Sequence, residues 1–164
     1  MIYRTVWIAI AATFGIFTSQ APEFAQQYSQ RLGGAIDELR VVIADFEEDA
    51  RSNGMAAKEA LETWGQSADS FLRDRAESMQ RTFSRFDSLE SQQTAFESLP
   101  EMARPVALLR TFDQRVLDGA WDDYKPAVPV TPPGLIWAGA GALFGAAIVS
   151  FFRLFGRRKR RAAV

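Results

Sequence analysis

The sequence predicts an all-α membrane protein in which two terminal transmembrane helices flank a periplasmic helical middle, either a long helical hairpin or a three- to four-helix bundle. Three observations support this fold class: an apolar run at each end of the chain, a helical spacing of apolar residues between the runs, and a sharp partition of charge. The 164 residues suffice for one helical domain besides the two membrane segments.

The C-terminal apolar run, residues 134–156, is the clearest membrane segment. It carries one charge, Arg153, close to its end, and a helix needs roughly 20 apolar residues to cross about 30 Å of hydrocarbon. Basic residues follow directly in the tail 157–164, namely Arg157, Arg158, Lys159, Arg160 and Arg161. Because cytoplasmic flanks carry an excess of Lys and Arg, we interpret them as topology anchors rather than as a nucleic-acid patch. The chain is therefore expected to end in the cytoplasm.

The charge partition places the middle of the chain on the other side of the membrane. All 20 acidic residues lie between Glu23 and Asp123, whereas 7 of the 19 basic residues lie outside the middle. The middle has a net charge of −8 and the two ends together have +7. The positive-inside rule predicts this pattern for a middle that is exported across an inner membrane.

The N-terminal apolar segment, residues 1–21, has two interpretations. It could be a cleaved signal peptide, because Ser19 to Ala21 form a small-x-small cleavage site. It could instead be a retained membrane helix, which we favour because Pro22, directly after that site, has no N–H and a fixed φ that disfavour cleavage. Arg4, the one charge of this segment, then acts as a further cytoplasmic topology anchor, and residues 20–133 are expected to be periplasmic.

Apolar residues at steps of three and four predict helices over residues 22–52, 55–66, 71–98 and 104–118, which form a periplasmic bundle over residues 22–120. We expect Pro22 in a first turn capped by Thr18 or Ser19, a cap at Asp69 or Ser70, and stops at Asn53-Gly54 and Gly119. The predicted core positions are Phe24, Tyr28, Leu32, Ala35, Leu39, Val42 and Phe46, then Leu72, Ala76, Met79, Phe83, Phe86, Leu89, Gln93 and Phe96, then Val106, Leu109, Phe112 and Val116. An intermolecular coiled coil is the alternative interpretation of these stripes.

Residues 121–133 contain four prolines and predict an extended connector into the second membrane helix. This connector bears on a resemblance to a known family. The segment PEFAQQYSQRLGGAIDELR, at 22–40, resembles the signature of a family of small proteobacterial inner-membrane proteins, known only as a domain of unknown function, number twenty-nine thirty-seven. The connector YKPAVPVTPPG at 124–134 and the plan of two terminal crossings resemble it too. The resemblance implies a membrane location, and it implies neither an activity nor catalytic residues.

Small residues at four-residue spacing mark helix-packing positions in both apolar segments. They are Ala11 and Gly15 in the first segment, and Ala138, Gly141, Ala142 and Gly145 in the second. Because small residues let helix backbones approach closely, we expect either the two crossings of one chain to pair or a second copy or larger complex to bind there. Gly33 and Gly34 interrupt the first middle helix and are expected to pack against a neighbouring helix, with a hinge or docking point as the alternative.

The composition excludes several classes of functional site. The chain has no His and no Cys, which excludes the common zinc sites, the usual catalytic triads and disulfides. The acidic cluster at 45–49 lacks the ligand order of a calcium loop and is expected to be solvated, and so is the cluster at 118–123, for which a basic partner is the alternative. We therefore expect a non-enzymatic accessory, scaffold or oligomer-forming subunit without a cofactor, whose partners are membrane lipid and a protein or second copy. The alternative is a periplasmic domain that binds a ligand or lipid inside the bundle, near Phe83 and Phe86.

Overall fold

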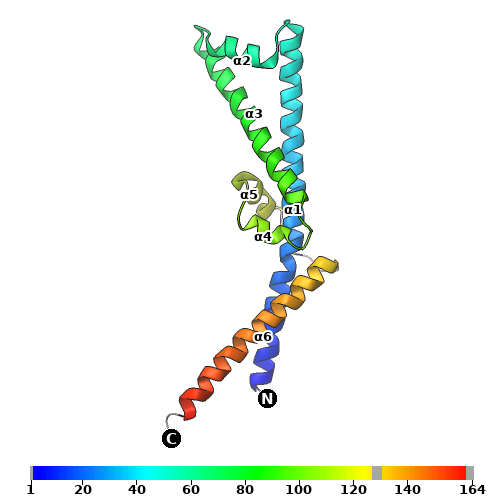
Figure 1. Ribbon diagram of the computed structural model, residues 1–164, viewed down its shortest axis with the longest axis vertical. Coiled ribbons are helices and arrows are strands. Elements are labelled where there is room, and N and C mark those ends of the chain that lie inside the picture. Colours follow the sequence, from blue (N-terminus) through cyan, green and yellow to red (C-terminus); the bar gives the residue numbers. More distant parts are fainter. Residues whose placement is uncertain (1, 127–130, 162–164) are drawn as a thin grey trace. The chain divides into compact units, whose positions relative to one another are not determined.

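The computed structural model consists of helices joined by short segments (Figure 1). It describes residues 2–126 and 131–161, and this part of the chain contains no strand. The helices are α1 (Ile2–Ser52), α2 (Ala57–Gly65), α3 (Ser70–Glu97), α4 (Arg104–Leu108), α5 (Gln114–Asp122) and α6 (Pro132–Arg161). The prediction of an all-α protein is confirmed.

The chain forms two compact units. Unit 1 comprises Met1–Gln27, Leu99–Arg110 and Ala120–Val164, and unit 2 comprises Tyr28–Ser98 and Thr111–Gly119. Helices α1 and α5 each contribute residues to both units. Unit 1 therefore contains both apolar ends of the chain, and unit 2 contains most of the charged middle.

Helix α1 continues through Pro22, so the prediction that a helix begins there was wrong. Pro22 has no N–H to donate to the carbonyl of Thr18, which normally costs helix stability. The hydroxyls of Thr18 and Ser19 do not cap a helix start. They donate to the carbonyls of Phe14 and Ile16, at 2.8 and 2.7 Å, as Ser and Thr do inside helices.

In unit 2, α1 and α3 lie antiparallel. Tyr28 packs on Phe96 with ring centroids 5.9 Å apart, the Arg40 guanidinium lies over Phe86 at 5.7 Å, and Phe46 meets Phe83 at 6.1 Å. Positions rise along α1 as they fall along α3. Helix α2 adds Trp64, whose ring lies 5.4 Å from that of Phe46.

The spacing on α3 predicted its core face correctly. The stripe contains the buried residues Ala76, Met79, Leu89 and Phe96 and the half-buried residues Leu72, Phe83, Phe86 and Gln93. On α1 the predicted stripe is correct at Tyr28, Leu32 and Phe46, which are buried, and wrong at positions between them. Ile36 and Ile43 are buried, whereas Val42 is 46 % exposed. Ile43 follows Val42 directly, so apolar spacing alone fits either residue, and packing against Met79 of α3 buries Ile43.

The loops that flank α2 follow the predicted signals. After α1 the chain turns at Gly54, whose φ of +73° suits glycine, and Met55 N–H donates to the Ala50 carbonyl at 3.0 Å in a Schellman arrangement. Asp69 caps α3, since its carboxylate accepts from the Phe71 N–H at 2.9 Å.

The single helix predicted over 104–118 is instead two helices. Helix α4 ends at Leu108, α5 begins after Asp113, and Gly119 lies inside α5 rather than ending a helix. Asp113 breaks the pattern because its carboxylate accepts from Val116 N–H at 3.0 Å, which is the geometry of an N-cap. Of the predicted stripe only Val116 is buried, and Val106, Leu109 and Phe112 are exposed.

Helix α6 begins two residues before the predicted segment and runs through the basic tail to Arg161. The connector is shorter than predicted, since residues 121 and 122 belong to α5. Residues 127–130 of the connector and 162–164 of the tail lie outside the described residues. In the described part of the chain, one helical stretch, Pro132–Phe151, is long and apolar enough to cross a membrane, with a mean hydropathy of 1.8. The described part of the N-terminal segment does not meet the same criterion, so the prediction of two membrane helices is not confirmed.

Candidate functional site: a close helix pair with a polar collar

Unit 1 is built on the pairing of α1 with α6 (Figure 1). The Thr18 hydroxyl donates to the Trp137 carbonyl at 2.8 Å. A Cβ placed on Gly15 would lie 3.0 Å from the Ala138 carbonyl oxygen, and one on Gly145 would lie 3.2 Å from the Ala11 Cα. Positions rise on α1 as they fall on α6, so the two helices are antiparallel.

Gly141 marks the closest approach in the pair. A Cβ at this position would overlap Thr18 Oγ1 and would lie 2.6 Å from the Phe14 carbonyl oxygen. Contacts below 3.0 Å with a backbone atom leave no room for a side chain, so the backbones meet here only because residue 141 is glycine.

The predicted helix-packing residues thus divide between two places. Those in the apolar segments face each other within one chain, and they are Ala11, Gly15, Ala138, Gly141, Ala142 and Gly145. Gly33 and Gly34 lie in unit 2, where a Cβ on Gly33 would lie 3.9 Å from the Gln93 amide nitrogen and one on Gly34 would meet nothing within 4 Å. The structure therefore gives close packing to the former set and at most ordinary contact to Gly33.

Large apolar side chains of the pair point outward. Ala11, Gly15 and Ser19 form its buried stripe on α1, whereas Phe17 on α1 and Leu143 on α6 are each 75 % exposed. Further exposed large side chains are Val6, Trp7, Ile8 and Ile16 on α1 and Leu135, Ile136, Phe144 and Phe151 on α6. Small residues inside and large apolar residues outside invert the arrangement of a water-soluble core, and membrane helices show this pattern.

Polar and aromatic side chains form a collar at the end of the pair where α6 begins. Tyr124 donates to the Gln20 amide oxygen at 2.9 Å, and Thr131 donates to the Glu23 carboxylate at 3.2 Å. Burial and, secondly, the Glu23 charge raise the pKa of Tyr124, which keeps the phenol a donor.

Aromatic rings complete this collar. The ring of Phe24 lies edge-on to Tyr124 and to Trp121, at 5.5 and 5.8 Å. Trp and Tyr favour the boundary between hydrocarbon and water, because one part of each ring system is apolar and another forms hydrogen bonds.

The antiparallel arrangement also determines at which end of the helix pair the predicted topology anchors lie. The pairing of residue 18 with 137 and of residue 11 with 145 brings the start of α1 and the end of α6 to the same end of the pair. Arg4, which is exposed, precedes this end on α1. The backbone of 157–161 continues α6 beyond it, and the side chains of that basic run lie outside the described residues. All the charges of the two terminal segments are positive.

A buried polar network in unit 2 was not predicted. The Tyr28 side chain is fully buried, and its hydroxyl lies 2.9 Å from the Gln92 amide and accepts from Asp113 N–H at 2.9 Å. Arg85 binds the Asp113 carboxylate through two hydrogen bonds, at 3.0 and 3.1 Å. The sequence signal was available, since an Asp directly before a helical run is a common N-cap. The network fixes the start of α5 against α1 and α3.

These contacts perturb two pKa values. Burial, as the largest cause, raises the pKa of Tyr28. Burial also raises the pKa of Asp113, but hydrogen bonds from Arg85 and the backbone together with the Arg85 charge outweigh it, so this pKa is lowered overall. Both groups therefore keep the protonation states that their hydrogen bonds require.

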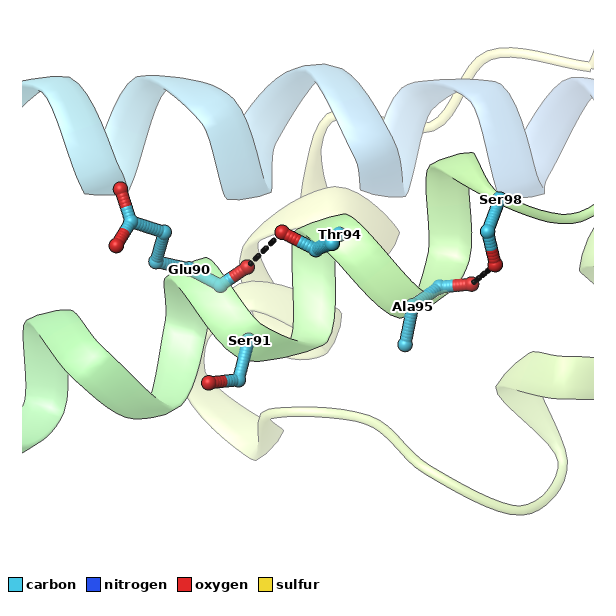
Figure 2. Close-up of a pocket in the computed structure, with 5 residues that line it drawn as sticks. All are labelled: Glu90, Ser91, Thr94, Ala95 and Ser98. Carbon is cyan, nitrogen blue, oxygen red and sulfur yellow. Dashed lines mark hydrogen bonds between the residues drawn. The ribbon is translucent and has the colours of Figure 1, made fainter.

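A surface depression lies on α3 and is lined by Glu90, Ser91, Thr94, Ala95 and Ser98 (Figure 2). Two of its hydroxyls are already bonded within the helix, since Thr94 donates to the Glu90 carbonyl at 3.0 Å and Ser98 donates to the Ala95 carbonyl at 2.7 Å. The Glu90 carboxylate lies 3.8 Å from the Arg40 guanidinium. The polar side chains of Glu90, Thr94 and Ser98 thus bind groups of the hairpin itself.

Residues 2–162 match the family model described as "Protein of unknown function (DUF2937)". No curated protein and no solved structure matches the chain.

The helix pair predicts that a large side chain is harmful at Gly141 of α6 and tolerated at Gly139. Gly141→Ile should lower the thermal unfolding midpoint in detergent micelles, because overpacking against the α1 backbone costs about 1–3 kcal/mol. Gly139→Ile is the matched control, since a Cβ at Gly139 meets nothing within 4 Å. Equal midpoints for the two variants would contradict the close pairing.

The Asp113 network predicts a specific acid dependence. A carboxylate whose folded-state pKa is depressed contributes stability above its unfolded pKa, and this contribution disappears as pH falls through the folded pKa. Thermal unfolding followed by circular dichroism should show the wild type losing stability between about pH 5 and pH 2. Asp113→Asn should lose less over that range and be less stable at pH 7. Asp87→Asn, which changes an exposed carboxylate of α3, should keep the wild-type slope, and a shared slope for all three proteins would refute the assignment.

Proposed function

The chain belongs to this family of unknown function, and we propose that it is a non-enzymatic inner-membrane protein that serves as an accessory, scaffold or oligomer-forming subunit of a membrane assembly. One observation carries the proposal: unit 1 buries glycine and alanine between α1 and α6 and exposes Phe17 and Leu143. Lipid favours this arrangement because close backbone packing, not hydrophobic burial, drives association of helices in a bilayer.

On this proposal both apolar segments cross the membrane. The antiparallel pairing supports it, because two crossings joined by an exported middle must run in opposite directions. The positive charges that flank both segments, Arg4 and residues 157–161, belong to one end of the pair, which we assign to the cytoplasm. The collar of Gln20, Glu23 and Tyr124 then marks the periplasmic boundary, and residues 20–133 are periplasmic.

The interior of unit 2 supports a structural role better than the ligand-binding alternative. A ligand in the bundle would need space beside Phe83 and Phe86. Both rings instead pack against the core cluster formed by Ile43, Phe46, Ala50, Ala60 and Met79. On α1, unit 2 offers a protein partner an apolar surface at the adjacent side chains of Val41 and Val42, which are 61 % and 46 % exposed.

Topology is tested with reporter fusions. Alkaline phosphatase inserted after Asn53 of the full chain should be active, because the enzyme needs an exported environment, whereas the same reporter at the C-terminus should be inactive. A green fluorescent protein in each position should give the reverse result. Activity of the phosphatase at the C-terminus, or cytosolic behaviour of the Asn53 fusion, would contradict the two-crossing topology.

The scaffold role is tested by the mass of the protein purified from native membranes. Light scattering in mild detergent should give a protein mass well above the 18.3 kDa of one chain, from further copies or a co-purified subunit. Val42→Glu should reduce this mass, and Gln80→Glu, which adds the same charge at an exposed polar position on α3, should not. A strict monomer without partners would contradict the proposal.

A further inference from the structure

The segment Leu99–Arg110 belongs to unit 1, together with the helix pair. It contains α4, in which Pro105 and Leu108 are buried. On its other side Met102, Val106 and Leu109 are 45 %, 44 % and 83 % exposed. The segment therefore packs by one apolar face and leaves a second apolar face uncovered.

A hydrogen bond ties this segment to the start of the candidate membrane span. The Trp137 indole N–H donates to the Met102 carbonyl at 3.1 Å. Trp137 lies in the early part of Pro132–Phe151, next to Leu135 and Ile136, which are 58 % and 52 % exposed. The uncovered face of 99–110 thus lies at the level of α6 where the side chains of Leu135 and Ile136 already face outward.

The charges of the segment fit a phospholipid surface. The segment contains two basic residues, Arg104 and Arg110, and one acidic residue, Glu101, although the middle of the chain as a whole is acidic. Arg110 is exposed and directly follows the most exposed apolar side chain, Leu109. Interfacial segments combine an apolar face with basic side chains that reach lipid phosphates.

We propose that Leu99–Arg110 is an interfacial segment that inserts into the leaflet at the Trp137 end of the helix pair. Val106 and Leu109 enter the boundary between headgroups and acyl chains, and Arg110 binds lipid phosphate. This inference rests on the proposed membrane anchoring, to which it adds a third lipid contact. The occupant of the apolar face is lipid rather than a second protein, because the face continues the outward apolar surface of α6.

The chain offers a clean test because it contains no Cys, so that an introduced Cys is the one thiol in the protein. The full chain is reconstituted in vesicles of phosphatidylethanolamine and phosphatidylglycerol with a polarity-sensitive fluorophore on Leu109→Cys. Leu143→Cys, at an outward position within the span, reports whether the anchor is inserted. Lys58→Cys, on α2 with an 89 % exposed side chain, is the water-exposed control. Circular dichroism of each labelled protein checks that the helices are intact.

If the inference is correct, labels at Leu109 and Leu143 emit at shorter wavelength than the label at Lys58. Nitroxide-bearing lipids then quench both, and aqueous iodide quenches both several-fold less. A Leu109 label that matches Lys58, while Leu143 is lipid-quenched, overturns the interfacial segment and leaves the anchor intact. A Leu143 label that matches Lys58 overturns both proposals. Protection of Leu109 from iodide without quenching by nitroxide lipids means that protein covers the face, which overturns the assignment to lipid.

Discussion

The contact between the backbones of α1 and α6 is the interaction on which unit 1 depends. At Gly141 there is no space for a Cβ, and at Gly145 and Gly15 a Cβ would lie 3.0–3.2 Å from backbone atoms of the opposite helix. Burying glycine removes little apolar surface from water, so this contact would contribute little in aqueous solution. In lipid, close backbones gain dispersion and weak Cα–H···O contacts, while the large outward side chains remain solvated by acyl chains. The proposed bilayer is thus part of the energetics of the fold.

Thr18 shows how a polar group supports such a contact. Its hydroxyl donates to carbonyls of its own helix, at Phe14, and of the opposite helix, at Trp137, both at 2.8 Å. One O–H has a single proton, so these two bonds share it. Pro22 leaves the Thr18 carbonyl without its usual helical donor. The side chain therefore joins the two helices at the turn of α1 where the backbone ladder is weakest.

The spacing of apolar residues predicted the core face of α3 correctly. It failed between α4 and α5, where a side chain distant in the sequence helps to fix the helix boundary. The stripe on α3 identified Met79, Leu89 and Phe96, because apolar residues at steps of three and four have one way to face α1. The same spacing joined α4 to α5 wrongly, because it runs through Asp113. A hydroxyl 85 residues away, that of Tyr28, binds the Asp113 N–H and fixes the break. The N-cap at Asp113 could have been recognised within 104–118, but its partner on α1 could not.

The two units differ in which side chains they bury, and α1 belongs to both units. Before residue 27 its buried positions hold small residues, Ala11, Gly15 and Ser19, with large side chains outside. From Tyr28 onward the buried positions hold large residues, and charged groups such as Arg40 face water. The backbone geometry of a helix is the same along its length, so it does not explain why small residues are buried in one part of α1 and large residues in the other. If the proposed membrane location is correct, the change follows the solvent, and it coincides with the collar at Gln20 to Phe24. We therefore place the boundary between lipid and water on α1 between Ser19 and Tyr28.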